Sequence, residues 1–370
     1  MAFYVDQLFY RQPGGIATYL KGLLPRLAPL LGDEPILFYH RPGRECDRET
    51  GLPGRKAPLG MARETAALLW HTVGFPRLER WLGSMDLLHL PSLFFVSSRA
   101  PLVATVHDLA VFRFPHLFPY RWRVLHGRAL RLIFGRARLI LCDSASTEAD
   151  FLAAFPGRSR PATRVVPLGV EPPREMAEDE VRARLGRMGL RPGYLLYVGT
   201  LEPRKNLSRL AAAWRKVTEK GVAGERELVL VGPMGWLGER EREQVLSLPN
   251  SRWLGYRSPD DLEALYRGAD VFVYPSLYEG FGLPVLEAMA RGIPVVASST
   301  PALVEVSGDA ALFPDPLSEE EIARAIEELL RDEEARRELA RAGTKRASVF
   351  TWERTAQMTY ESYLEILGRG

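Results

Sequence analysis

Short apolar runs alternate with longer segments of helical periodicity from the start of the chain. This alternation is typical of parallel strands joined by crossover helices. In the first half we predict strands at about Ala2 to Asp6, Pro35 to His40, Asp86 to Leu90, Pro101 to His107, Arg138 to Asp143 and Thr163 to Leu168. Helices are predicted between them.

The alternation restarts after Gly169 to Asp179, a segment in which glycine, two prolines and charged residues leave little apolar content. Such a composition favours an interdomain linker. Beyond it we predict strands at about Tyr194 to Gly199, Glu227 to Gly232, Ser251 to Tyr256, Asp270 to Pro275, Pro294 to Ala297 and Ala310 to Pro314. A charged helical tail follows, broken around Phe350 to Trp352. The fold class predicted is α/β, with two doubly wound domains at residues 1–172 and 173–351 whose ligand groups lie at the carboxyl ends of the strands.

Composition excludes several classes of protein. The 370 residues are 46% hydrophobic and 26% charged, so a disordered chain, a collagen and a disulfide scaffold are ruled out. No apolar stretch approaches the roughly 18 residues of a membrane span, and the first residues lack the pattern of a signal peptide. We therefore expect a cytoplasmic protein in which Cys46 and Cys142 are reduced structural thiols. The six histidines show no metal-ligand spacing, so no metal is expected.

Charge is distributed unevenly. Up to Pro172 the chain has 22 Lys and Arg against 14 Asp and Glu, or +8, and the remainder has 27 against 32, or −5. In the segment Arg121 to Arg138, helical spacing groups three arginines on one side, Arg121, Arg128 and Arg131, opposite an apolar set, Trp122, Ala129, Leu130 and Ile133. This pattern fits a helix that docks on an anionic membrane surface. It fits equally an ordinary surface helix in an arginine-rich chain.

The segment Ser276 to Pro294 (SLYEGFGLPVLEAMARGIP) follows a predicted strand and leads into a short helix. Gly280 and Gly282 flank Phe281 before that helix, so the backbone amides up to Leu283 can approach a phosphate or a sugar oxygen. Glu279 and Glu287 stand on either side of this turn. Carboxylates accept hydrogen bonds from hydroxyl groups, so the segment predicts a nucleotide-sugar site.

Two adjacent cations follow the first strand of the second domain, in Tyr194 to Leu207 (YLLYVGTLEPRKNL). Arg204 supplies a planar fork and Lys205 a point charge, a combination suited to a diphosphate at a strand's carboxyl end. Asn206 is predicted to cap the next helix. A solvated cationic turn is the alternative for this segment taken alone.

The first domain carries two weaker signals. Gly14 and Gly15 lie between the first strand and the first helix and permit close approach of a ligand to the backbone. The apolar strand beginning at Pro101 delivers His107 and Asp108 at its carboxyl end, where the other ligand groups are expected. A structural histidine is the alternative.

With these residues, nearly the whole chain resembles retaining glycosyltransferases of the GT-B fold, in family 4. The resemblance rests on Glu279 and Glu287, on Arg204 and Lys205, on the glycine turn at Gly14 and Gly15, and on His107. It implies two Rossmann-like domains facing a central cleft, with the C-terminal helix, residues 352–370, returning to the acceptor-side first domain. Thr200, a further donor-side position, stands where many members carry an arginine, and Arg204 beside Lys205 substitutes for it.

By that resemblance Glu287 holds the ribose hydroxyls, Glu279 with the amides of Phe281 and Gly282 holds the transferred sugar, and His107 contacts a sugar hydroxyl. It implies retention of anomeric configuration. The sequence shows no acidic triad suited to a divalent metal and no residue identifiable as a covalent nucleophile, so we expect metal-free, front-face attack assisted by the leaving phosphate. The EPRKN, HDL and SGDAALFPDP stretches most resemble members that transfer mannose from GDP-mannose to a saccharide or lipid-linked acceptor in surface polysaccharide synthesis.

Other functions stay open at this point. A nucleotide-sugar epimerase, a sugar phosphorylase or a non-catalytic nucleotide-sugar sensor could use a similar two-domain frame. Nucleic-acid binding is suggested by the interleaved aromatics and arginines of Phe112 to Arg123, but it leaves the Glu279 and Lys205 segments unexplained, so we expect no nucleic-acid partner.

Overall fold

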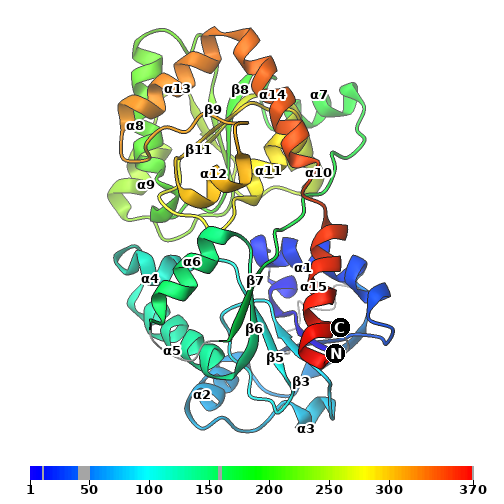
Figure 1. Cartoon of the computed structure of the whole chain (residues 1–370). Coiled ribbons are helices and arrows are strands. Elements are labelled where there is room, and N and C mark those ends of the chain that lie inside the picture. Colours follow the sequence, from blue (N-terminus) through cyan, green and yellow to red (C-terminus); the bar gives the residue numbers. More distant parts are fainter. Residues whose placement is uncertain (11, 41–50, 157–160, 369–370) are drawn as a thin grey trace. The chain divides into compact units, whose positions relative to one another are not determined.

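The computed structural model describes residues 1–10, 12–40, 51–156 and 161–368. Contacts divide the chain into two compact units, one of Met1–Gly169 with Phe350–Gly370 and one of Val170–Val349. The boundaries proposed from the sequence lie at 172 and 351. In Figure 1 the first unit runs from blue to green and includes the red C-terminal helix, and the second runs from green to orange.

The first unit contains a parallel sheet of seven strands in the order β3-β2-β1-β4-β5-β6-β7. The strands are β1 (Ala2–Tyr4), β2 (Ile36–His40), β3 (Arg55–Leu59), β4 (Leu88–Leu90), β5 (Leu102–Val106), β6 (Ala137–Cys142) and β7 (Ala162–Val165). Its helices are α1 (Gly15–Leu27), α2 (Arg63–Thr72), α3 (Glu79–Leu82), α4 (Ala110–Arg113), α5 (Tyr120–Arg136), α6 (Ala145–Ala154) and α15 (Trp352–Leu367), with 3-10 turns at Asp6–Phe9, Ala28–Leu30 and Pro115–Leu117.

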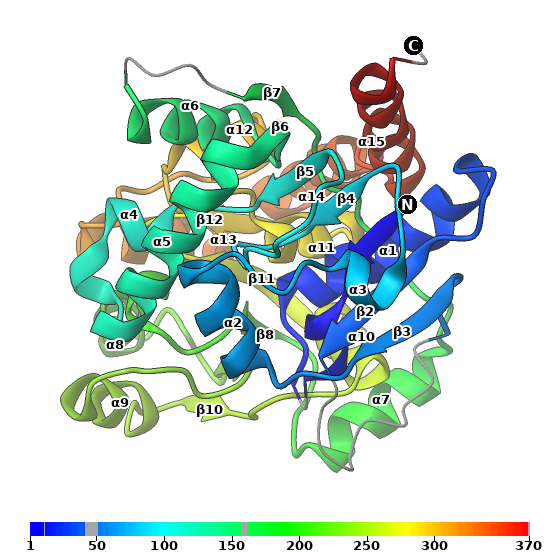
Figure 2. The same cartoon turned by 90° about the horizontal axis from the view of Figure 1, so that it is seen from below.

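Both faces of this sheet are covered by helices, which explains why its strands are apolar without a strict alternation. Tyr4 and Ile140 belong to the core that also contains Trp70 of α2 and Ile133 of α5. Phe3, one residue along β1, faces the other way and lies 6.3 Å from the ring of Tyr363 in α15. Figure 2 shows α2 and α5 on one side of the sheet and α1 with α15 on the other.

The last helix packs on α1 because two glycines make room for one tryptophan. A Cβ added at Gly22 would lie 2.1 Å from the Trp352 ring, and one at Gly169 would lie 2.2 Å from the Trp352 nitrogen. Deeper along α15, the Tyr363 hydroxyl lies 2.6 Å from His89 Nδ1. The residues that follow the second unit thus complete the core of the first.

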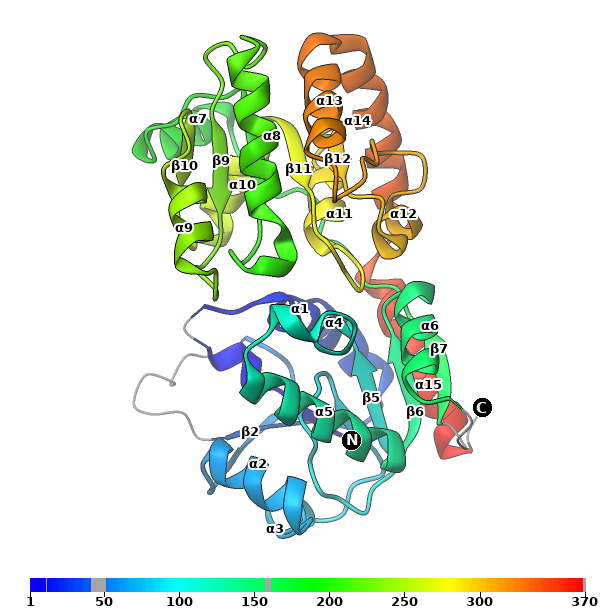
Figure 3. The ribbon, with the colours of Figure 1, turned by 90° about the vertical axis from the view of Figure 1, so that its left-hand side faces the viewer.

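The second unit contains a parallel sheet of five strands in the order β10-β9-β8-β11-β12. The strands are β8 (Tyr194–Val198), β9 (Leu228–Val231), β10 (Ser251–Trp253), β11 (Ala269–Tyr274) and β12 (Val295–Ala297). Its helices are α7 (Glu178–Arg187), α8 (Leu207–Glu219), α9 (Glu239–Leu246), α10 (Pro259–Arg267), α11 (Leu283–Ala290), α12 (Pro301–Ser307), α13 (Glu319–Arg331) and α14 (Glu333–Ala347), with a 3-10 turn at Pro203–Lys205. Figure 3 shows α8 and α13, which contact each other, side by side over the sheet.

The predicted class, two doubly wound parallel α/β domains, is confirmed, and two strands need correction. The strand predicted at Ala310 to Pro314 is wrong: Leu312 makes an isolated bridge to Val296, and Pro314 and Pro316 prevent a longer ladder. Strand β3 was missed because its residues, RKAPL, are mostly exposed at the sheet edge and lack an apolar signal.

The predicted pattern of the helix around Arg128 is correct except at Trp122. Ala129, Leu130 and Ile133 are buried, but Trp122 is 43% exposed because the first turns of α5 do not cover the sheet. Cys142 is a free, buried thiol, and Cys46 lies outside the described residues. None of the helices in the described ranges has the length and apolar content needed to cross a membrane.

Candidate functional site

The loops that follow β8 and β11 meet at the carboxyl edge of the second sheet. These strands pair in parallel, and beyond them the Leu277 amide donates to the Arg204 carbonyl at 2.9 Å. Asn206 joins the loops further, because its Nδ2 donates to the carbonyls of Pro275 at 3.0 Å and Pro316 at 2.7 Å. Asn206 therefore precedes α8 as predicted, but the prediction that its side chain caps the helix is wrong.

This junction brings Arg204, Lys205 and Glu279 into direct contact. Lys205 Nζ lies 2.6 Å from Glu279 Oε1, and Arg204 Nη1 lies 2.9 Å from Glu279 Oε2. Lys205 also donates to the Tyr274 hydroxyl at 2.6 Å, and Arg204 donates to the Tyr278 carbonyl at 2.8 Å. The segments Tyr194 to Leu207 and Ser276 to Pro294, far apart in the sequence, therefore contribute to one cluster.

A second carboxylate, Glu202, completes the cluster and was not predicted. Its Oε1 accepts from Arg204 Nε at 3.0 Å and lies 2.7 Å from Arg204 Nη2. The position of Glu202 two residues before Arg204, in EPRKN, is the signal that could have identified it. The four side chains, each at most 11% exposed, comprise two cations and two carboxylates.

The electrostatics follow from burial and proximity. Burial by itself raises the pKa of a carboxyl group, but Arg204 and Lys205 outweigh it and lower the pKa of Glu279 to about 2. Burial and the neighbouring charge of Arg204 lower the pKa of Lys205. The charges of the cluster are thus preorganised: Arg204 and Lys205 are held in place by the ionised Glu279 carboxylate before any ligand binds.

The glycine turn positions the start of α11 beside Glu279. Gly282 has a φ of 105° and precedes the helix, and a Cβ there would lie 2.4 Å from Leu303 Cδ2, so only glycine fits. Pro284 stands in the first turn, where its missing N–H costs nothing, and the helix ends at Ala290 before Gly292. The first amides of a helix need acceptors outside it, which makes this turn suitable for an anionic or hydroxylated ligand.

Glu287 lies on α11, and its carboxylate is held from α10. The Tyr266 hydroxyl donates to Glu287 Oε2 at 2.8 Å. Burial raises the pKa of Glu287, although this hydrogen bond and Arg291 oppose the shift. The glutamate is partly exposed, so it has both a protein partner and access to solvent.

In the first unit His107 pairs with Asp143, a residue that sequence analysis did not select. His107 Nδ1 lies 2.6 Å from Asp143 Oδ2, and Nε2 lies 3.1 Å from the Pro91 carbonyl. Burial lowers the pKa of a histidine, but Asp143 outweighs it and the pKa of His107 is raised. Asp143 follows β6, which pairs with β5, the strand before His107, so the shared sheet edge is the signal that identifies it.

The remaining candidate positions are backbone elements. Gly14 precedes α1 and Gly15 begins it, and a Cβ added at either would meet no atom within 4 Å, so the packing of the described residues does not require glycine there. Thr200 follows β8 and is partly exposed. Its carbonyl accepts from the Tyr197 hydroxyl at 3.3 Å.

The predicted residues thus divide between the units. Gly14, Gly15 and His107 lie in the first unit. The second unit contains the others: Thr200, Arg204, Lys205, Glu279, Gly280, Phe281, Gly282, Leu283 and Glu287. Arg204, Lys205 and Glu279 are in mutual contact, whereas Glu287 is held separately by Tyr266.

Comparison with known proteins supplies the family. Residues 187–346 match the family described as glycosyl transferases group 1, and residues 13–174 match glycosyltransferase family 4. The O-antigen chain mannosyltransferase B of Escherichia coli is 30% identical over 94% of this chain and 95% of its own length. A D-inositol 3-phosphate glycosyltransferase of Paenarthrobacter aurescens is 27% identical over 95% of this chain and 93% of its own.

Solved structures share the fold at lower identity. Sucrose-phosphate synthase from Thermosynechococcus elongatus superposes with a TM-score of 0.77 at 21% identity, covering 100% of this chain and 99% of that one. The Anabaena protein HepE, solved with UDP and glucose, has a TM-score of 0.74 at 20% identity, covering 98% and 99%. Together with the two family matches and the full-length relative, these findings establish that the chain belongs to the glycosyl transferases of group 1, family 4, and is a glycosyltransferase of the GT-B fold.

Proposed function

We propose that this glycosyltransferase moves mannose from GDP-mannose, with retention of configuration, to a saccharide or lipid-linked acceptor in surface polysaccharide synthesis. The observation that carries the proposal is the buried cluster of Glu202, Arg204, Lys205 and Glu279 beside the start of α11. The choice of mannose is supported by the relative named an O-antigen chain mannosyltransferase, 30% identical along the chain.

In the proposed mechanism the chain stabilises the departing nucleoside diphosphate with fixed charges. Negative charge develops on the phosphate oxygens as the glycosidic bond breaks, and Arg204, Lys205 and the amides before Pro284 supply donors and positive charge there. Each Glu279 oxygen accepts from one cation, and in this proposal the carboxylate also accepts from a hydroxyl of the transferred sugar. Glu279 therefore contacts the transferred sugar and also Arg204 and Lys205, the two cations that bind the departing diphosphate.

The two units have different tasks in this proposal. The second unit, residues 170–349, binds the nucleotide sugar, with Glu287 on the ribose and Thr200 and the turn Gly280 to Leu283 around the phosphates and sugar. The first unit, residues 1–169 with 350–370, binds the acceptor. Gly14 and Gly15 admit the donor close to the backbone. His107, whose Nδ1 is held by Asp143 at 2.6 Å, contacts a sugar hydroxyl through Nε2 in place of the Pro91 carbonyl.

A donor panel tests the function. The purified chain is incubated with GDP-mannose, GDP-fucose, UDP-glucose and ADP-glucose and an oligomannose acceptor, and the product linkage is determined by NMR. We expect transfer from GDP-mannose with an α-linkage. Transfer from another donor only, inversion of configuration, or epimerised or phosphorolysed sugar without transfer would contradict the proposal.

Metal independence is part of the same proposal, because two cationic side chains take the place that a divalent ion has in other transferases. We expect the initial rate to be unchanged in excess EDTA. A loss of activity that magnesium or manganese restores would show that a metal participates.

We further propose that the enzyme is cytoplasmic and that its first unit docks on the anionic inner face of a membrane. Residues 109–142 contain seven arginines and no aspartate or glutamate. Seven of the fourteen large hydrophobic side chains exposed in the described part of the chain lie in two segments, at and after the end of α2 and in the first turns of α5: Leu68, Val73, Phe75, Tyr120, Trp122, Val124 and Leu125.

The two segments are joined. Helices α2 and α5 contact each other, and Arg128 Nε of α5 donates to the His71 carbonyl of α2. Exposed apolar side chains among arginines are the arrangement by which an interfacial surface enters lipid headgroups, each arginine contributing about 1 kcal/mol near an anionic leaflet.

Liposome co-sedimentation tests the docking. We expect binding to phosphatidylglycerol-containing vesicles that weakens with salt and is lost in Arg121→Glu/Arg123→Glu. The matched control is Arg240→Glu/Arg242→Glu, two exposed arginines at the start of α9, which should leave binding unchanged. Equal binding to neutral vesicles, or none to either, would contradict membrane docking without affecting the donor assay.

A further inference from the structure

The hydrogen bond between Tyr266 and Glu287 joins two helices of the second unit. Tyr266 is 1% exposed, and its hydroxyl lies 2.8 Å from Glu287 Oε2. A buried tyrosine hydroxyl needs a partner, but here the partner is a carboxylate with access to solvent rather than a backbone carbonyl. This bond therefore determines how a partly exposed acid is oriented.

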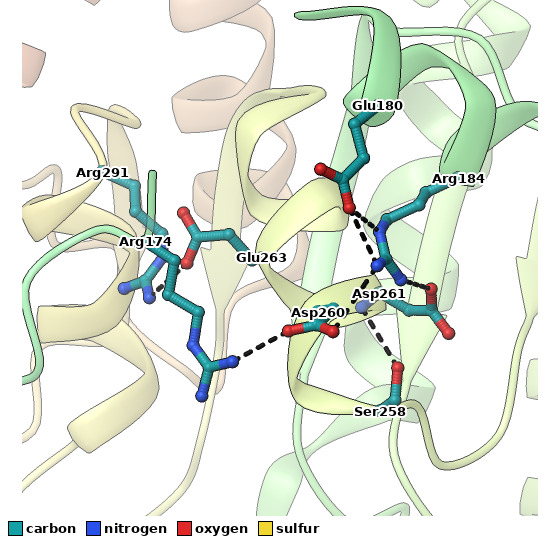
Figure 4. Close-up of polar contacts among 8 residues, drawn as sticks. All are labelled: Arg174, Glu180, Arg184, Ser258, Asp260, Asp261, Glu263 and Arg291. Atoms are coloured by element: carbon teal, nitrogen blue, oxygen red, sulfur yellow. Dashed lines mark hydrogen bonds and ion pairs between the residues drawn. The ribbon is translucent and has the colours of Figure 1, made fainter. Parts of the chain in front are cut away.

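The tyrosine ring is itself held on two sides. The Arg291 guanidinium lies 5.1 Å from its centroid, and the Phe272 ring of β11 lies 5.9 Å away. Arg291 donates to Glu263 Oε2 at 2.9 and 2.7 Å and to the Glu287 carbonyl at 2.9 Å. Figure 4 shows Arg291 and Glu263 directed toward each other.

Glu263 anchors this arrangement from α10. It is 1% exposed and also accepts from Arg267 Nε at 3.1 Å. Glu263 and Tyr266 are one helical turn apart, so α10 presents to α11 both the hydroxyl that holds the Glu287 side chain and the carboxylate that holds Arg291. The Tyr266 ring thus lies between Arg291 and Phe272 while its hydroxyl donates to Glu287.

We infer that Tyr266 is a positioning residue that fixes the Glu287 carboxylate for the ribose of the nucleoside diphosphate. The inference rests on the proposed function, in which Glu287 binds the ribose hydroxyls. With one lone pair of Oε2 occupied by Tyr266, three lone pairs remain on the two oxygens, enough for a bidentate contact with a vicinal diol. Holding the carboxylate in advance removes a rotational freedom that ligand binding would otherwise have to restrict.

The charges around Glu287 make the pH dependence of GDP binding a second test of this role, beside the affinity itself. The groups that face it are Tyr266 and Glu263 of α10 and Arg291 of its own helix; α14 packs on the neighbouring Met289 through the uncharged Gly343 and Thr344. Burial raises the pKa of Glu287 and the Tyr266 hydrogen bond lowers it. Removing the hydroxyl therefore raises this pKa further, and a protonated Glu287 accepts fewer hydrogen bonds.

The test is a double-mutant cycle with GDP as the ligand, read by calorimetry. Tyr266→Phe should weaken GDP binding about threefold to tenfold, and Glu287→Gln about tenfold or more. In the Glu287→Gln background, Tyr266→Phe should have no further effect. The acid limb of GDP affinity should move to higher pH in Tyr266→Phe.

Tyr194→Phe is the matched control. Tyr194 is 2% exposed in the same unit, and its hydroxyl donates at 2.6 Å to the Leu265 carbonyl of α10, so its removal costs a similar buried hydrogen bond on the same helix that does not involve Glu287. We expect GDP affinity and its pH profile to be unchanged in this variant. Equal weakening in both variants would show a general structural effect and overturn the inference.

The outcomes separate the inference from the function it rests on. If Glu287→Gln weakens GDP and Tyr266→Phe does not, the positioning role is wrong and the ribose role of Glu287 stands. If the effects of the two substitutions add, Tyr266 acts independently of Glu287 and the inference is again overturned. Arg291→Lys, which loses the paired bonds to Glu263 but keeps the charge, is a second variant expected to weaken GDP only when Glu287 is present.

Discussion

At the scale of single residues, the cluster around Glu279 makes binding and stability interdependent. Glu279 is the shared partner of Arg204 and Lys205. In Glu279→Gln two nearly buried cations lose a common carboxylate, so the unligated protein should be destabilised by about 3 to 5 kcal/mol. GDP should recover part of that loss because its phosphates supply negative charge. Urea unfolding with and without GDP measures both effects, and a variant as stable as wild type would contradict the role of the ion pairs.

His107 and Asp143 give a pH-dependent prediction. The pKa of His107 is raised above its ordinary value of 6.5, so the protonated form is stabilised by folding. This contribution is fully present below pH 6.5 and is lost as pH rises through the raised pKa. Asp143→Asn should therefore cost about 1.5 to 3 kcal/mol at pH 6 and less at pH 9. Unfolding curves at the two pH values test this, and an equal cost at both would mean that His107 does not change its protonation state between them.

At the scale of secondary structure elements, the contact between α1 and α15 depends on the absence of a side chain at Gly22. A Cβ there would lie 2.1 Å from the Trp352 ring, so Gly22→Ala should destabilise the first unit by about 1 to 3 kcal/mol. Gly135→Ala in α5 is the matched control, because nothing lies within 4 Å and alanine favours a helix by about 0.5 to 1 kcal/mol. A neutral Gly22→Ala, measured by thermal unfolding, would contradict this packing.

The strands and helices also show which patterns in the sequence are sufficient to predict an element and its bounds. Buried strands such as β8 and β11 were predicted within one or two residues, because continuous apolar runs between glycine and proline have few alternatives. The break predicted around Phe350 to Trp352 is also found, because Thr351 caps α15 by accepting from the Arg354 amide. The apolar pattern does not predict the exposed edge strand β3 or the isolated bridge at Leu312. Pairing at a sheet edge depends on the adjacent strand rather than on the sequence of the segment itself.

At the scale of the whole molecule, the division into two units predicts where a nucleotide acts. The cluster of Glu202, Arg204, Lys205 and Glu279 belongs entirely to residues 170–349. GDP alone should therefore slow amide exchange in that unit, most strongly after β8 and in the first turn of α11. At 100 times its dissociation constant a ligand adds about 2.7 kcal/mol to the stability of the fold that binds it. Hydrogen exchange by mass spectrometry tests this, and protection confined to residues 1–169 would contradict the assignment of the nucleotide to the second unit.

Periodicity, glycine turns and strand ends are local properties, so the amino-acid sequence is enough to predict the two parallel α/β domains, the carboxyl-edge loops and the residue types that carry the chemistry. The fold is needed to show that Lys205 and Glu279, 74 residues apart, are an ion pair, that Glu202 balances the charge, and that Tyr266 holds Glu287. It also decided that α15 completes the first unit through Gly22. These pairings follow from strand order and register, which place distant segments side by side and which no local pattern of hydrophobic and polar residues specifies.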